Sequence, residues 1–156
     1  MKKMLGTMML TLLLLALGGC SSDNDDVIYT EAYARSFLDL MQANENETGI
    51  RMEIYPPIIF IDSMPAFLAT TLTNLSDNNF ATGYHQTIDF FDGTEWVRAM
   101  PPQVASDVQV HIKPSQMFEL TSHSLDLIED LTIGKYRLVH FHGGGEYQYA
   151  IFFVVQ

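Results

Sequence analysis

The fold is decided by the sequence at 134–155, which reads Gly-Lys-Tyr-Arg-Leu-Val-His-Phe-His-Gly-Gly-Gly-Glu-Tyr-Gln-Tyr-Ala-Ile-Phe-Phe-Val-Val. Aromatic and β-branched residues are frequent on both sides of Gly143-Gly144-Gly145, and such segments are typical of strands joined by a short turn. We therefore predict strands over 135–142 and 147–155, joined as a hairpin.

The second of these strands is apolar on both faces. One face would carry Tyr149, Ile151, Phe153 and Val155, and the other Ala150, Phe152 and Val154. A sandwich strand normally turns one polar face to water. We expect the outer set to be covered, either by another part of this chain or by a partner protein or a second copy.

Beyond Gly49 the chain repeats this pattern of short apolar or alternating runs between turn residues. Further strands are predicted over 50–55, 66–74, 84–91, 95–100, 107–113 and 116–120. Asp92-Gly93 predicts a hairpin turn between two of them. Seven or eight short strands at this spacing predict an all-β, antiparallel β-sandwich.

A helix is predicted ahead of the strands. Apolar residues from Tyr29 to Met41 recur at spacings of three and four, and Thr30 can cap the first turn, which indicates a helix over 30–43. Its apolar stripe is the nearest cover for the last strand. An unstructured stalk is the alternative for this segment.

The N-terminus has the layout of a secretory signal peptide. A basic start is followed by the apolar run Met4–Leu17, which is shorter than the roughly 20 residues that span a membrane. The next residues, Leu17-Gly18-Gly19-Cys20, resemble the lipobox of bacterial lipoproteins. The resemblance implies that residues 1–19 are removed and that Cys20 carries acyl chains, palmitate among them. Ser21 favours the outer membrane, with the domain on the periplasmic side or at the cell surface.

Composition and charge exclude one class of partner. The chain has 156 residues, of which 47% are hydrophobic and 17% charged, and this suits a single folded domain. Its formal charge is −11, and loss of Lys2 and Lys3 with the leader leaves 6 basic against 19 acidic side chains. Such a surface repels phosphate, so no nucleic-acid partner is expected.

Three fragments resemble a bacterial immunoglobulin-like domain family that is common in exported proteins. They are Thr71-Leu72-Thr73-Asn74-Leu75-Ser76, Phe91-Asp92-Gly93-Thr94-Glu95-Trp96-Val97 and Leu131-Thr132-Ile133-Gly134-Lys135-Tyr136-Arg137-Leu138. The resemblance implies a sandwich for spacing or binding, without catalytic residues or a cofactor. It also implies three structural residues. Gly134 would precede a tyrosine corner, in which the Tyr136 hydroxyl bonds to backbone upstream, and Trp96 would pack between the sheets with Phe90, Tyr136 and Phe152.

No recognisable catalytic motif is present. His140 and His142 share a face of their predicted strand and, together with Glu146, could ligate Zn²⁺. The alternative is two strand-end histidines beside a hairpin loop. Asp62-Ser63-Met64 resembles a short O-glycosylation pattern of exported bacterial proteins, with Ser63 as the acceptor.

The predicted organisation has three segments. A lipoprotein signal peptide covers 1–19, the lipidated Cys20 with an acidic tether and a helical segment covers 20–49, and an immunoglobulin-like domain covers 50–156. We predict a membrane-anchored, non-enzymatic interaction or accessory module, whose partners are the lipid membrane through Cys20 and a protein or second copy through the last strand. The alternatives are a metal-dependent activity at His140 and His142 and a structural spacer in an envelope complex.

Overall fold

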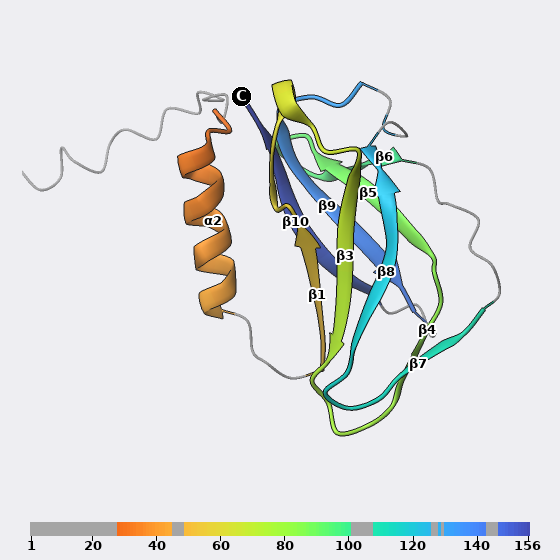
Figure 1. Cartoon of the computed structure of the whole chain (residues 1–156). Coiled ribbons are helices and arrows are strands. Elements are labelled where there is room, and N and C mark those ends of the chain that lie inside the picture. The colour runs from red at the N-terminus through yellow and green to blue at the C-terminus, as the bar shows by residue number, and fades with distance from the viewer. Residues whose placement is uncertain (1–27, 45–48, 101–107, 126–127, 129, 143–146) are drawn as a thin grey trace, which may run out of the picture.

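The computed structural model describes residues 28–44, 49–100, 108–125, 128, 130–142 and 147–156 (Figure 1). These contain the α-helix α2 (Glu31–Asn44), the short 3-10 helix η1 (Ile61–Ser63) and the strands β1 (Ile50–Tyr55), β2 (Ile58–Phe60), β3 (Phe67–Asn74), β4 (Phe80–Thr82), β5 (Gln86–Phe91), β6 (Trp96–Met100), β7 (Val110–Ile112), β8 (Met117–Ser124), β9 (Gly134–Phe141) and β10 (Tyr147–Val155). The predicted leader, Cys20 and the acidic tether lie outside the described residues. In the described part of the chain, no helix has the length and apolar character needed to cross a membrane.

Two sheets face each other across a common core. One has the strand order β1-β3-β8, and the other β2-β10-β9-β5-β6. A third sheet, β4-β7, lies at one end of the molecule (Figure 1). The core takes apolar side chains from both large sheets, including Met52, Ile54, Leu68, Leu72, Leu120, Ile88, Tyr136, Leu138, Phe152 and Val154. The predicted mainly β architecture is therefore confirmed, and the predicted helix is present as α2.

Each of the eight predicted strands is present, although β7 is shorter and β8 longer than expected. The predicted number of strands is nevertheless too small, because β2 and β4 were missed. Each has three residues, which is too few to show an alternating pattern.

The prediction of a purely antiparallel arrangement is wrong at one edge, where β2 pairs with β10 in parallel and Phe153 lies opposite Ile58. Pro56 and Pro57, which follow β1, have no N–H groups to continue its ladder. The chain leaves the three-stranded sheet there and joins the other sheet at Ile58 without a reversing turn.

Helix α2 covers the outer face of β10, as the two-sided apolar pattern of that strand predicts. Thr30 caps the helix by accepting a hydrogen bond from the Tyr33 N–H at 3.2 Å. Phe37 packs edge-on against Phe153, with ring centroids 5.4 Å apart. The shared apolar cluster contains Ala34, Phe153 and Val155 in its centre and Tyr29, Phe37, Leu38, Ile58 and Ile151 around it. The alternative of an unstructured stalk is therefore wrong for 31–44.

The predicted hairpin turn at Asp92-Gly93 connects β5 to β6. The Asp92 carboxylate accepts hydrogen bonds from the N–H groups of Thr94 and Glu95 and from the Thr94 hydroxyl. These bonds favour the ionised form and lower the pKa of Asp92. Gly93 has a φ of 105°, a conformation that favours glycine.

Candidate functional site

The outer face of the five-stranded sheet is divided into two parts. Helix α2 covers the part formed by β10 and β2, whereas the part formed by β6, β5, β9 and the start of β10 carries charged and aromatic side chains. We call the second part the cationic–aromatic face, and it consists of Asp89, Phe91, Trp96, Arg98, Lys135, Arg137 and Tyr149.

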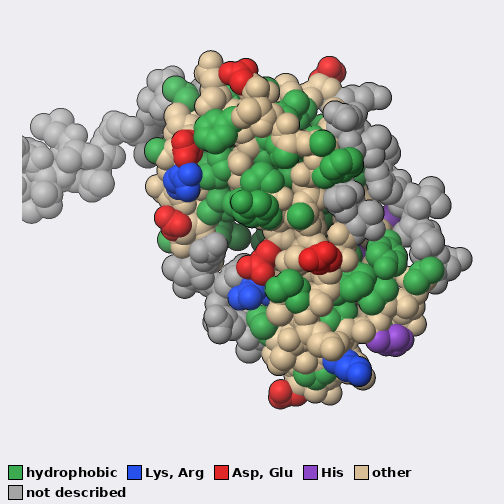
Figure 2. All heavy atoms as spheres, viewed as in Figure 1, with side chains coloured by type: hydrophobic (Ala, Val, Ile, Leu, Met, Phe, Trp, Pro, Cys, Tyr) green, Lys and Arg blue, Asp and Glu red, His purple; other side chains and the backbone are tan. Residues whose placement is uncertain are grey.

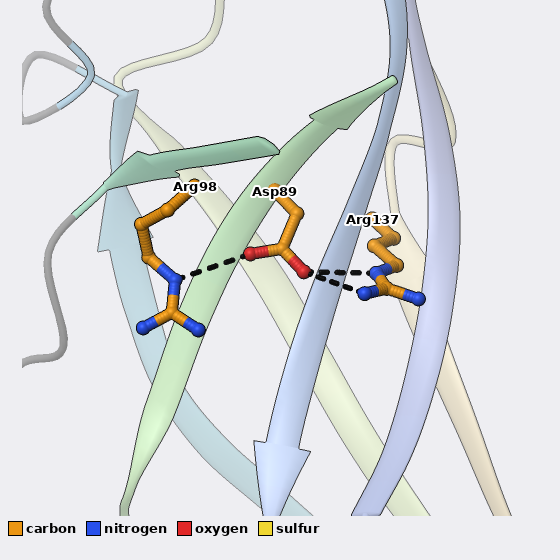
Figure 3. A network of polar contacts seen from close by, with 3 residues as sticks. All are labelled: Asp89, Arg98 and Arg137. Carbon is orange, nitrogen blue, oxygen red and sulfur yellow. Dashed lines mark hydrogen bonds and ion pairs between the residues drawn. The ribbon is translucent and has the colours of Figure 1, made fainter. Parts of the chain in front are cut away.

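Asp89 holds two arginines from the neighbouring strands (Figure 3). Its Oδ1 accepts from Arg98 Nε at 3.3 Å, and its Oδ2 accepts from Arg137 Nε at 2.9 Å. Asp89 is buried, while the side chains of Arg98 and Arg137 are 47% and 21% exposed. One carboxylate therefore fixes two guanidinium groups, and both arginine side chains remain partly exposed.

Lys135 lies between aromatic rings from three elements. Its Nζ is 3.8 Å from the ring centroid of Phe91, 5.3 Å from that of Phe37 and 5.4 Å from that of Trp96. Partial burial lowers the pKa of the Lys135 amine. No described carboxylate forms an ion pair with it.

Arg137 lies between two aromatic side chains. Its guanidinium carbon is 4.6 Å from the Trp96 ring centroid and 5.9 Å from that of Tyr149. Tyr149 is 43% exposed, and its ring contacts that of Tyr147, which is also exposed. The face therefore combines fixed cations with accessible aromatic surface.

The prediction that Trp96 packs between the sheets is wrong. Trp96 lies on the outer face beside Phe91, with ring centroids 5.3 Å apart. The cause is an irregularity in the β5–β6 register, where Ile88 pairs with Met100 but Asp89 pairs with Arg98. The extra residue, Ala99, reverses the alternation of β6, so Met100 enters the core while Trp96 and Arg98 face outward.

Tyr136 makes the hydrogen bonds that the tyrosine-corner pattern predicts. Its hydroxyl donates to the Thr132 carbonyl at 2.9 Å and accepts from the Thr132 N–H at 3.1 Å. Its ring stacks on Phe152, with centroids 5.2 Å apart. Gly134 lies directly against the Phe90 ring, and a Cβ at this position would overlap that ring.

The two candidate zinc ligands both lie beside β4. Nε2 of the buried His140 shares a hydrogen bond with the Thr82 hydroxyl, and His142 packs edge-on against Phe80. Glu146 lies outside the described residues. Among the residues that the structure places, no group of three His, Cys, Asp or Glu side chains is close enough to hold a metal ion.

The candidate glycosylation residue, Ser63, is the last residue of η1 and is exposed. It lies in the connection between β2 and β3 and belongs to neither of the two sheets. The structure therefore leaves its hydroxyl accessible.

A cavity of about 390 Å³ lies between α2, β1 and β10. Its volume falls within the range of small-molecule sites. Arg51 Nε and Glu53 Oε2 are 3.6 Å apart at its wall. The other lining residues are Leu38, Met41, Met52, Ile54, Pro57, Tyr149, Ala150 and Ile151.

Sequence reasoning did not identify the ion-pair network. Asp89, Arg98 and Arg137 are separated in the sequence and meet only because Asp89 is the cross-strand partner of both arginines. The available signal was the strand 135–142, in which Lys135 and Arg137 alternate with Tyr136 and Leu138. That alternation indicates a polar outer face but not what lies opposite it.

Comparison with known proteins gives no family. No protein-family model and no curated protein matches the chain. Solved structures with similar regions include a β-glucosidase from Listeria innocua in complex with gluconolactone, with 8% identity, a TM-score of 0.40 and coverage of 70% of this chain and 16% of that one. Another is the Pseudomonas fluorescens alkylpurine DNA glycosylase AlkC bound to DNA containing an abasic site analog, with 15% identity, a TM-score of 0.40 and coverage of 79% and 37%. The chain thus spans only a minor part of the length of either enzyme.

Proposed function

We propose that this chain is a lipoprotein held in the outer membrane by acylated Cys20, and that its domain is an immunoglobulin-like, non-enzymatic protein-interaction module. The observation that carries the interaction role is the cationic–aromatic face. It lies on adjacent strands of one sheet, its two arginines are fixed by Asp89, and it stays partly exposed although α2 covers the adjacent surface. Trp, Tyr and Arg are the residues most enriched at the energetic centres of protein interfaces.

The strand order supports the immunoglobulin-like part of this proposal. In such domains the last two strands lie beside C and C′ in one sheet, and A, B and E lie in the other. The orders β10-β9-β5-β6 and β1-β3-β8 correspond to this arrangement. Tyr136 near the start of β9 occupies the place of the tyrosine corner. The chain departs from antibody domains because Cys20 is its only cysteine and because no tryptophan lies in its core.

The membrane anchor is tested by Cys20→Ala in the full-length chain. We expect the variant to lose acylation and to leave the membrane fraction. A variant that stays in the membrane after a high-salt wash and is processed normally would contradict the anchor.

The interaction role is tested by photo-crosslinking in intact cells. A photoreactive phenylalanine analogue is placed at Tyr149, on the proposed binding face, or at Met117, which is 62% exposed on the opposite sheet. We expect a discrete protein adduct from position 149 and none from position 117. Equal adducts from both positions, or none from either, would favour the structural spacer.

A further inference from the structure

The cationic–aromatic face is a local exception in an acidic protein. Of the six basic side chains outside the leader, three lie here: Arg98, Lys135 and Arg137. Together with Asp89 they have a formal charge of +2. On the face formed by α2 and the three-stranded sheet, in contrast, the basic side chains lie apart from one another (Figure 2).

Asp89 satisfies only part of this positive charge. Its single negative charge balances that of one of the two arginines. Lys135 contacts aromatic rings and forms no ion pair with a described carboxylate. An ammonium group that is partly shielded from water gains more from an incoming anion than one in free solution does. Charge complementarity therefore indicates an anionic ligand.

The aromatic side chains indicate that this ligand is a peptide. Trp96 and Tyr149 flank Arg137, and Arg98 and Lys135 lie on different strands, so a single small anion would leave most of the face unused. A segment with acidic and aromatic residues would contact the cations and the rings together. Salt screens charges beyond about 8 Å, so a short segment bound on this face is attracted by the three local cations. A nucleic acid or an anionic bilayer extends past the face and is also repelled by the negative charge of the rest of the protein.

We propose that the cationic–aromatic face binds an acidic peptide segment of a partner protein. This inference rests on the proposed interaction function and specifies its ligand. Arg98 and Lys135 supply the positive charge that the peptide carboxylates contact, and Trp96 and Tyr149 supply the surface on which its apolar groups pack.

The test measures binding of a short synthetic peptide of alternating Glu and Tyr to the full-length protein by fluorescence anisotropy. The variants are Arg98→Gln and Lys135→Gln, and Lys113→Gln is the matched control, because Lys113 is exposed between β7 and β8. We expect each variant on the face to weaken binding by about tenfold and the control to leave it unchanged. Binding should also weaken as salt rises from about 50 to about 500 mM.

The inference would be overturned by no binding of the Glu peptide, by equal binding of a Lys-Tyr peptide, or by an equal loss in Lys113→Gln. Binding of an oligogalacturonate in place of the peptide would assign the face to an acidic saccharide and would also overturn it. Arg98 is half exposed, so Arg98→Gln provides a test in a folded protein even if Lys135→Gln loosens the contact with Phe37. The adduct from position 149 separates this inference from the interaction function. If that adduct persists in Arg98→Gln while the unmodified protein fails to bind the Glu peptide, the interaction function stands and only the acidic ligand is wrong.

Discussion

The inner and outer faces of the five-stranded sheet are formed by the same strands but are closed in different ways. The inner face meets the second sheet, and its side chains, such as Ile88, Leu138 and Phe152, are fully buried. On the outer face, among the elements that the structure describes, helix α2 covers Phe153 and Val155 but not the aromatic and charged residues nearer β6. In this domain the inner face therefore specifies the fold, and the outer face provides both a docked helix and an accessible surface.

The largest expected effect comes from removing the helix. A chain that starts at Ile50 would expose the outer apolar side chains of β10, and each buried apolar side chain contributes up to about 1.5–3 kcal/mol. Several such losses are comparable with a domain's whole stability of about 5–15 kcal/mol. We expect the short form to melt at a lower temperature than a chain that starts at Ser21, or else to self-associate. Equal melting temperatures and a monomeric short form would mean that the helix contributes little.

An intermediate effect is expected at Gly134, on the inner face. In Gly134→Ala the new methyl group meets the Phe90 ring, and overpacking of this kind costs about 1–3 kcal/mol. The matched control is Gly83→Ala, where the nearest atom to the new Cβ, the Val108 carbonyl oxygen, is 3.8 Å away. Urea denaturation should show a clear loss for the first variant and a smaller one for the second. Phe90→Leu in the Gly134→Ala background should recover part of the loss, and no recovery would argue against the overlap.

The smallest effect is expected for Tyr136→Phe, which keeps the stacked ring and removes only the hydroxyl. Loss of its bonds to Thr132 should cost on the order of 1 kcal/mol. Thermal denaturation should show a lower midpoint with the fold retained. Tyr147→Phe is the control, because Tyr147 is 50% exposed and its hydroxyl should contribute little. Equal midpoints for the two variants would contradict the role of the corner.

The sequence was most informative where one pattern had one structural solution. The two-sided apolar strand 147–155 needed a cover, and the predicted helix offered the nearest apolar stripe, so the contact between them was predictable. The turn at Asp92-Gly93 was predictable for a similar local reason, since this pair between two apolar runs is a strong signal for a hairpin.

The cationic–aromatic face depended on information that no local pattern contains. Whether Trp96 faces inward or outward depends on one extra residue, Ala99, because a shift of one residue moves every side chain to the other face. The contacts of Asp89 with Arg98 and Arg137 depend in turn on the register between three strands. The short strands β2 and β4 are held by pairing with distant partners, and their own three residues have no distinctive signal.

The docking of α2 and β2 on β10 also affects how the chain folds. Both elements come early in the sequence, and the strand that they need comes at its end, so these contacts close very long loops. Folding slows as the mean sequence separation of contacts rises, and the apolar stripe of α2 has no partner until β10 is in place. We expect the inner face to form first and the helix to dock in a late step, during which the unfinished domain presents an aggregation-prone surface.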